Sequence, residues 1–250
     1  MTIFKNSTQS HEHSLQILNL LYEYDDFMDS VKVITDMGCG AGLDTHWWAT
    51  LNNREDPPKP HNYLCYAVDQ ATDGIDKSAR HLKNVKVIPK NFEQTVLPRL
   101  ADVIWCHDAF QYALNPLNTL AVWNAQMNTD GMLVMCVPQS QSHEYNRFKS
   151  RSYSGCYHNY TLLNLMYMLA VNGFDCRDGF FLKKQNDPWI NVAVYKNEVP
   201  MDPANTTWWD LAERKLIPDS VINCLNKYGF VKQEEIVVRW LDKDYYRVKD

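Results

Sequence analysis

The stretch that decides the fold is Val31-Lys32-Val33-Ile34-Thr35-Asp36-Met37-Gly38-Cys39-Gly40-Ala41-Gly42. Its first seven residues form a largely apolar, β-branched run that predicts a short strand. The three glycines that follow allow a sharp turn and leave the backbone open to a ligand. An apolar pattern over residues 47–51 then predicts a helix, with Asp44 or Thr45 as its N-cap. The stretch therefore predicts a strand, a tight loop and a helix whose first N–H groups face a ligand of the loop.

Strands and helices alternate along most of the chain. Further strands are predicted at residues 63–68, 85–89, 101–106, 131–137, 180–182 and 190–195, and helices at residues 15–28, 75–82, 117–127 and 162–171. This alternation predicts an α/β fold with a Rossmann-like, doubly wound and mostly parallel seven-stranded sheet that has helices on both faces. In such folds, ligands bind beyond the carboxyl ends of the strands.

The alternation stops near residue 200. The last segment combines two helical stretches, at residues 208–216 and 221–228, with an apolar run at residues 236–240. We therefore expect residues 1–199, including the N-terminal helix, to form the ligand-binding domain and residues 200–250 to form a C-terminal α/β appendage.

The composition of the chain narrows its function. Hydrophobic residues make up 45% and charged residues 22% of the 250 residues, as in ordinary globular domains. The formal net charge of −5 gives no general attraction to phosphate backbones or anionic membranes, so nucleic acid is disfavoured as a partner. Residues 1–10 lack the apolar core of a secretory signal, and no apolar run approaches the roughly 20 residues that span a bilayer. These features predict a cytoplasmic protein with no membrane partner and leave its oligomeric state open.

The seven cysteines are scattered and form no Cys-x-x-Cys pair. Several lie within apolar, strand-like runs, which favours reduced and buried thiols. Because no metal-ligand spacing is present, we expect no metal site; a zinc site would require ligands brought together from distant parts of the chain.

Three features indicate what the glycine loop binds. Position 43, where a dinucleotide-binding loop has its third glycine, is Leu43, which disfavours a nicotinamide or flavin cofactor. Asp36 lies two residues before the first glycine, where a carboxylate would repel a pyrophosphate but attract a cationic amino-acid group. Asp69 follows the second strand, where its carboxylate can accept hydrogen bonds from both hydroxyls of a ribose. A nucleoside with an amino-acid moiety and a positively charged sulfur fits all three.

With the motif of residues 36–42 followed by Asp69, the sequence resembles the class I S-adenosylmethionine-dependent methyltransferases, in particular their small-molecule branch. The resemblance covers residues 31–195 as an order of elements and is specific at residues 36–42. It implies S-adenosylmethionine as the cofactor and in-line methyl transfer to a small-molecule acceptor. The motif and Asp69 are farther apart than the roughly 20 residues usual for such pairs, and a Pro-rich insertion at residues 56–60 accounts for the difference.

The resemblance also implies which residues bind the cofactor. Gly38, Cys39 and Gly40 would lie along its methionine part, and Asp36 would lie near its amino group. Asp69 would bind the ribose.

Five further residues complete this implied cofactor site. Gln70 is the next candidate for the ribose contact. Asn91 and Phe92 occupy the stretch that contacts the adenine in the family, although Asn91 replaces the acidic residue that is frequent there; its amide oxygen can still accept from the adenine amino group, and Phe92 can pack on the ring. Cys106 and His107 belong to the segment after the fourth strand whose backbone borders the cofactor.

The candidates on the acceptor side follow the later strands. Methyl transfer requires an in-line approach to the sulfonium methyl group, so positioning supplies most of the acceleration and a general base is optional. His107, Asp108 and His158 are the catalytic candidates, and Tyr112, Tyr145 and His158 are the candidates for binding the substrate.

Other functions stay open at this stage. A protein of the same fold could bind a related nucleoside and transfer an aminopropyl group, or have no catalytic activity. A nicotinamide-dependent oxidoreductase is disfavoured by Leu43. Methylation of nucleic-acid bases is disfavoured because the segment 115–118, Asn-Pro-Leu-Asn, lacks the motif that base-modifying relatives carry after the fourth strand.

Overall fold

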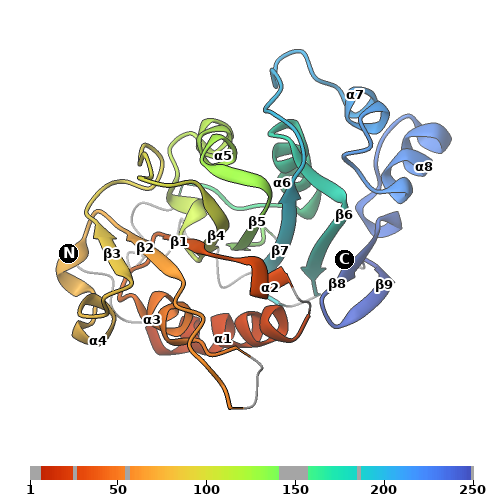
Figure 1. The fold of residues 1–250 in the computed structure, drawn as a ribbon. Helices are drawn as coiled ribbons and strands as arrows, with labels where there is room; N and C mark the ends of the chain where they lie inside the picture. The colour runs from red at the N-terminus through yellow and green to blue at the C-terminus, as the bar shows by residue number, and fades with distance from the viewer. Residues whose placement is uncertain (1–6, 25–26, 54–56, 141–156, 185–186, 249–250) are drawn as a thin grey trace.

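The computed structural model describes residues 7–24, 27–53, 57–140, 157–184 and 187–248. Within these residues, nine strands pair into one sheet in the order β3-β2-β1-β4-β5-β7-β6-β8-β9 (Figure 1). The strands are β1 (Val33–Met37), β2 (Leu64–Val68), β3 (Val85–Ile88), β4 (Ala101–His107), β5 (Met127–Pro138), β6 (Phe174–Lys183), β7 (Trp189–Lys196), β8 (Val237–Trp240) and β9 (Lys243–Arg247). The α-helices are α1 (Ser7–Tyr24), α2 (Phe27–Ser30), α3 (Leu43–Thr50), α4 (Lys77–Arg80), α5 (Pro116–Ala125), α6 (Leu162–Val171), α7 (Trp208–Glu213) and α8 (Asp219–Tyr228).

The α/β, Rossmann-like character of the fold agrees with the sequence prediction, but the sheet does not. Strands β3, β2, β1, β4 and β5 are parallel, whereas β7 lies antiparallel between β5 and β6. Two further strands, β8 and β9, continue the sheet beyond β6. The prediction of a mostly parallel seven-stranded sheet is therefore wrong, and the sheet is mixed and nine-stranded. The two added strands are only four and five residues long; β8 lies within the apolar run at residues 236–240, which the sequence did not assign to the sheet, and β9 is mostly exposed.

The two faces of the sheet are covered by different helices (Figure 1). On one face, α1, α3 and α4 pack with Leu18, Trp48 and Ala79 against inward side chains such as Trp105. On the other face, α5 and α6 pack with Trp123, Leu165 and neighbouring apolar residues. Helices on both faces cover the parallel strands, so β1 is buried along its whole length and β4 along most of its length.

Residues 200–248 pack on the same core as the preceding chain. Leu211, Ile217, Val221 and Val238 are all buried in the cluster that α5 and α6 form with the sheet. The hydroxyl of Tyr246 donates to the carbonyl oxygen of Phe181 at 2.6 Å, which ties β9 to β6. The division of the chain at residue 199 stays a prediction.

The start of α3 differs from the expected N-cap. The helix begins directly after Gly42, whose φ of +74° places it in the left-handed region, and no side chain caps the first turn. Asp44 and Thr45 instead point to other partners, described below. The prediction that one of them caps the helix is wrong because tertiary contacts use both side chains.

No helix in the described ranges combines the length and apolar character needed to cross a membrane.

Candidate functional site

The glycine loop connects β1 to α3 at the carboxyl end of the sheet. The N–H groups of Gly38 and Cys39 donate to the carbonyl oxygen of Val68, at 2.8 and 3.1 Å, and so fix the loop to the end of β2. Gly38 has a φ of +79°, and a Cβ atom there would lie 2.3 Å from the Cβ of Ala109. The segment after β4 therefore packs directly on the loop, and only glycine fits at this contact.

Gly40 is on the open side of the loop. Its φ is +51°, and a Cβ atom built there meets no protein atom within 4 Å. The residue itself is exposed. The loop therefore leaves space where the backbone of residues 38–40 can be approached by a ligand.

Asp69 joins the end of β2 to this loop. Its carboxylate accepts the Gly40 N–H at 3.0 Å through one oxygen and the Ala71 N–H at 2.8 Å through the other. The residue is partly exposed, and Gln70 beside it is exposed. The structure thus brings together two features that the sequence suggested separately, the glycine loop and the acidic residue after the second strand.

Asp36 is buried beneath the loop. It is 3% exposed, and it accepts the hydroxyl of Thr45 at 2.6 Å. Burial raises its pKa well above the usual range, and the carboxylates of Asp44 and Asp69 add to this effect. Three carboxyl groups therefore lie near the loop, and a cationic ligand, unlike a pyrophosphate, would favour the ionised form of all three.

Asp44 connects the first turn of α3 to the N-terminal helix. It accepts His11 Nδ1 at 2.7 Å and the Ser14 hydroxyl at 2.6 Å, both from α1, and the indole N–H of Trp105 at 3.0 Å. Burial opposes ionisation of Asp44, but these hydrogen bonds bring its pKa below the ordinary value. The hydrogen bond to Asp44 raises the pKa of His11. These contacts fix α1 beside the glycine loop.

His107 is the last residue of β4 and lies on the face that α1 covers. Its Nε2 is 2.9 Å from Nδ1 of His13 on α1, and its ring stacks on Trp105 with the ring centroids 5.9 Å apart. Burial lowers the pKa of His107 to about 4, so the imidazole is neutral near pH 7. Trp189 of β7 stacks on His13 at 5.5 Å.

The expected adenine-contacting residues lie beside the glycine loop. Phe92 would be 3.8 Å from a Cβ atom at Gly38, and its ring also lies against Trp123. The side-chain oxygen of Asn91 accepts the backbone N–H of Glu93 at 2.8 Å. Glu93 is buried and accepts the N–H of Leu114, so it connects this segment to the loop after β4.

The remaining candidates lie near the ends of β4 and β5. Cys106 is buried, and the other described ones are partly exposed. Cys106 is fully buried, so its side chain is directed into the core and any ligand contact would come from its backbone. Asp108 has a φ of +51°, in the left-handed region that aspartate adopts more readily than most residues other than glycine. Its carboxylate accepts the amide of Gln111 at 2.5 Å. The backbone N–H of His158 donates to the carbonyl oxygen of Gln111, beside Tyr112. Tyr145 lies outside the described residues.

The sequence reasoning missed several residues of this region. His11, His13 and Ser14 on α1, Trp105 on β4 and Trp189 on β7 all contact predicted site residues or their neighbours. The signal was the His-x-His-Ser cluster at residues 11–14, polar side chains at the start of an otherwise amphipathic helix. Its partners are 30 or more residues away, and periodicity does not identify them.

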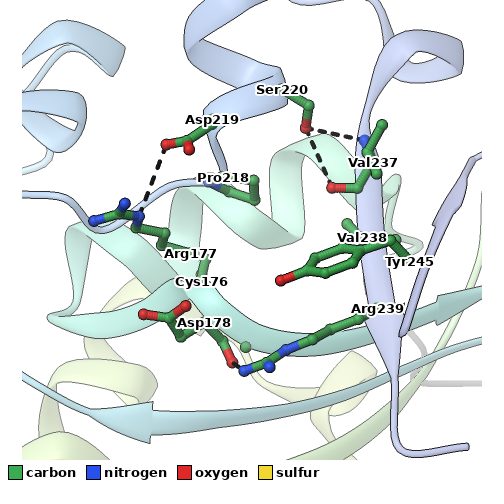
Figure 2. A pocket seen from close by; sticks show the side chains of 11 residues that line it. Cys176, Arg177, Asp178, Pro218, Asp219, Ser220, Val237, Val238, Arg239 and Tyr245 are labelled. Atoms are coloured by element: carbon green, nitrogen blue, oxygen red, sulfur yellow. Dashed lines mark hydrogen bonds and ion pairs between the residues drawn. The ribbon is translucent and has the colours of Figure 1, made fainter. Parts of the chain in front are cut away.

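A cavity of about 260 Å³ lies elsewhere, between β6 and the C-terminal segment (Figure 2). Three of its four charged side chains have partners: Arg177 pairs with Asp219 at 3.7 Å, and the guanidinium group of Arg239 donates to the backbone carbonyl oxygen of Asp178. Strands β4, β5 and β7 separate β1 from this region of the sheet. The cavity is therefore not part of the glycine-loop site.

No protein-family model matches the sequence. No curated protein matches it either. Solved structures do resemble the fold. One is the N-methyltransferase NodS from Bradyrhizobium japonicum WM9 in complex with S-adenosylhomocysteine, with a TM-score of 0.55, 14% identity, and coverage of 75% of this chain and 87% of that one. Another is magnesium protoporphyrin IX methyltransferase from Synechocystis PCC 6803 with bound S-adenosylhomocysteine, with a TM-score of 0.56, 12% identity, and coverage of 77% and 86%.

A third is 1,6-didemethyltoxoflavin-N1-methyltransferase from Burkholderia thailandensis, with a TM-score of 0.50, 15% identity, and coverage of 66% of this chain and 71% of that one. Identities this low establish the shared fold. The chain has the fold of the class I S-adenosylmethionine-dependent methyltransferases.

Proposed function

We propose that the protein is an S-adenosylmethionine-dependent methyltransferase that acts on a small-molecule acceptor by in-line methyl transfer. The observation that carries the proposal is the open glycine loop at the carboxyl end of β1, surrounded by the carboxyl groups of Asp36, Asp44 and Asp69. This arrangement suits a nucleoside with a cationic amino-acid moiety and opposes a pyrophosphate. Three structural neighbours with this fold are methyltransferases, which supports the same choice.

The residues present fit such a cofactor. The open side of Gly40 gives the methionine part access to the loop backbone, and an ammonium group near Asp36 would favour the ionised form of this buried carboxyl group. Asp69 and then Gln70 are the candidates for the ribose, and Asn91 and Phe92 those for the adenine. When bound, the cofactor supplies an electrophilic methyl group on a positively charged sulfur.

On the acceptor side, the protein positions the nucleophile and excludes water. His107 ends β4 and Asp108 follows it, and the backbone N–H of His158 donates to the carbonyl oxygen of Gln111, the residue before Tyr112. His107 stays a catalytic candidate from the sequence; its imidazole is neutral near pH 7, and its Nε2 faces Nδ1 of His13 on α1. Tyr145 stays a candidate from the sequence alone. The neighbours methylate 1,6-didemethyltoxoflavin and magnesium protoporphyrin IX, as their names state, and this supports a small-molecule acceptor. A cytoplasmic location without nucleic-acid partners remains part of the proposal on the basis of composition.

The first prediction concerns the choice of cofactor. Calorimetric titration of the purified protein should show binding of S-adenosylmethionine and S-adenosylhomocysteine and no binding of NAD, because the carboxyl groups around the loop repel a pyrophosphate. Mass spectrometry of any nucleoside that co-purifies provides an independent check. Tighter binding of NAD than of S-adenosylhomocysteine would overturn the proposal.

The second prediction separates ligand contact from loop strain. We expect Gly40→Val to abolish binding of S-adenosylhomocysteine, since the side chain fills the space open to the ligand. Gly229→Val is the matched control: Gly229 has a φ of +73°, and a Cβ atom there also meets nothing within 4 Å. The two variants should lose similar amounts of unfolding free energy in chemical denaturation, but only Gly40→Val should lose binding. Normal affinity in Gly40→Val would mean that the loop is only a turn.

A further inference from the structure

Three metal-binding side chains come together where α1 meets the ends of β4 and β5. Nδ1 of His13 is 2.9 Å from Nε2 of His107 and 3.8 Å from Sγ of Cys136. All three donor atoms lie within 4.8 Å of one another. Among the described residues, this group combines two imidazoles with a thiol.

The fold holds each of these side chains in place. His107 and Cys136 are register partners on neighbouring parallel strands, so their side chains project from the same face of the sheet. His13 reaches them from α1, which Asp44 anchors through His11 and Ser14 on either side of it in sequence. The three ligands come from elements that are far apart in the chain, so no local spacing motif could reveal them.

We propose that His13, His107 and Cys136 form a zinc site, with Nδ1 of His13, Nε2 of His107 and the thiolate of Cys136 as its three protein ligands. Two imidazoles and one thiolate are a donor set that Zn²⁺ favours. A tetrahedral ion with Zn–N of about 2.0–2.1 Å and Zn–S of about 2.3 Å separates two nitrogens by about 3.3 Å and a nitrogen from the sulfur by about 3.6 Å. The distances of 2.9 and 3.8 Å in the structure differ from these by less than about half an ångström.

The surroundings of the three ligands hold both imidazole rings and place charged groups near His13. Trp105 stacks on His107, and Trp189 stacks on His13, so both imidazole rings are held by aromatic neighbours. Burial has the largest effect on His13 and disfavours a positive charge there; the carboxylates of Asp187 and Asp44 partly offset this effect, and Lys184 adds to it.

Three protein ligands leave the fourth tetrahedral position for a water molecule or an exogenous ligand, as in catalytic zinc sites. On binding, Zn²⁺ takes the place of the Cys136 thiol proton, which leaves to the solvent. His13 and His107 are both partly exposed, so the ion can reach the site.

A hydrogen bond between the two neutral imidazoles is the alternative explanation for the 2.9 Å contact. It assigns no role to the thiol beside them. The two explanations differ in whether Cys136 contributes to affinity for a metal, and this difference decides the experiment.

The experiment uses the full chain, stripped of metal under reducing conditions and without any nucleoside, so it does not depend on the proposed methyl transfer. Zn²⁺ is titrated against a chromophoric chelator, and Co²⁺ is used as a spectroscopic probe. We expect one equivalent of Zn²⁺ to bind, and the Co²⁺ form to show tetrahedral d–d bands and a thiolate-to-cobalt charge-transfer band. Zn²⁺ should also raise the thermal midpoint of the wild type, because it binds only the folded protein.

Cys136→Ala and His13→Ala test the ligands. Each should weaken Zn²⁺ binding by more than the roughly 10- to 100-fold that loss of an outer-shell partner costs, and Cys136→Ala should remove the charge-transfer band. The controls are Cys176→Ala, which changes an equally buried thiol on β6, and His81→Ala, which changes an exposed imidazole. Both should bind Zn²⁺ like the wild type. Failure of the wild type to bind Zn²⁺, or wild-type affinity in Cys136→Ala, would overturn the assignment.

Discussion

Replacing Asp69 with alanine is expected to weaken binding of S-adenosylhomocysteine by roughly 30- to 1000-fold. If the carboxylate accepts both ribose hydroxyls, the variant loses two charge-assisted hydrogen bonds, worth about 2–4 kcal/mol together. Sequence considerations alone predict almost no change in stability. The structure alters that expectation, because Asp69 also accepts the N–H groups of Gly40 and Ala71. We expect the free energy of unfolding to fall by about 1–2 kcal/mol as well.

A second ligand separates the ribose contact from loosening of the loop. S-adenosylhomocysteine lacking both ribose hydroxyls should bind the wild type more weakly than the normal ligand, whereas Asp69→Ala should bind the two ligands equally. Asp73→Ala, which removes a nearby exposed carboxylate, should leave both affinities within about 0.5 kcal/mol of the wild-type values. If Asp69→Ala discriminates as well as the wild type does, the ribose contact belongs to another residue, and Gln70 is the first to test.

Replacing Gly38 with alanine is expected to destabilise the free protein by about 2–5 kcal/mol. The left-handed conformation at a φ of +79° costs about 1–2 kcal/mol for a residue with a Cβ atom. The contact at 2.3 Å with the Cβ of Ala109 adds overpacking of about 1–3 kcal/mol, because neither backbone segment can move without disturbing β1 or β4. Chemical denaturation monitored by circular dichroism measures the loss.

Gly229→Ala is the control for this comparison. Gly229 has a similar φ of +73° but no atom near the added Cβ, so only the backbone cost applies, about 1–2 kcal/mol. The excess loss in Gly38→Ala measures the packing of the glycine loop on the segment after β4. Equal losses of unfolding free energy in the two variants would show that the segment after β4 shifts at little energetic cost and that the contact with Ala109 does not constrain the loop.

Local sequence signals predicted the parts of the fold that depend on neighbours in the chain. The run from Val31 to Met37 predicted β1, and the apolar pattern of residues 162–171 predicted α6 with the same bounds as the structure. The three glycines indicated a tight loop, and all three have positive φ. These signals are local because strand and helix periodicity and the freedom of glycine depend on a few consecutive residues.

Local sequence signals did not predict the number of strands or the contacts that the N-terminal helix makes with the glycine-loop region. Strands β8 and β9 are short, and β8 joins the main sheet beside β6 through the pair Phe180 and Arg239, a contact between distant residues. Asp44 was interpreted as a helix cap, since Asp favours that position, but it binds α1 and Trp105 instead. The surroundings of a polar side chain depend on the assembled fold.

The sequence by itself determined the Rossmann-like architecture, the position of the glycine loop and the sign of the charge beside it. Those properties follow from periodicity, backbone freedom and the identity of Asp36 and Asp69, which the chain specifies locally. Only the tertiary structure decided that Asp69 holds Gly40, that Ala109 requires a glycine at position 38, and that His13, His107 and Cys136 meet. These contacts join segments from different strands and helices, and their geometry is set by how the sheet and its covering helices pack, which no short stretch of sequence encodes.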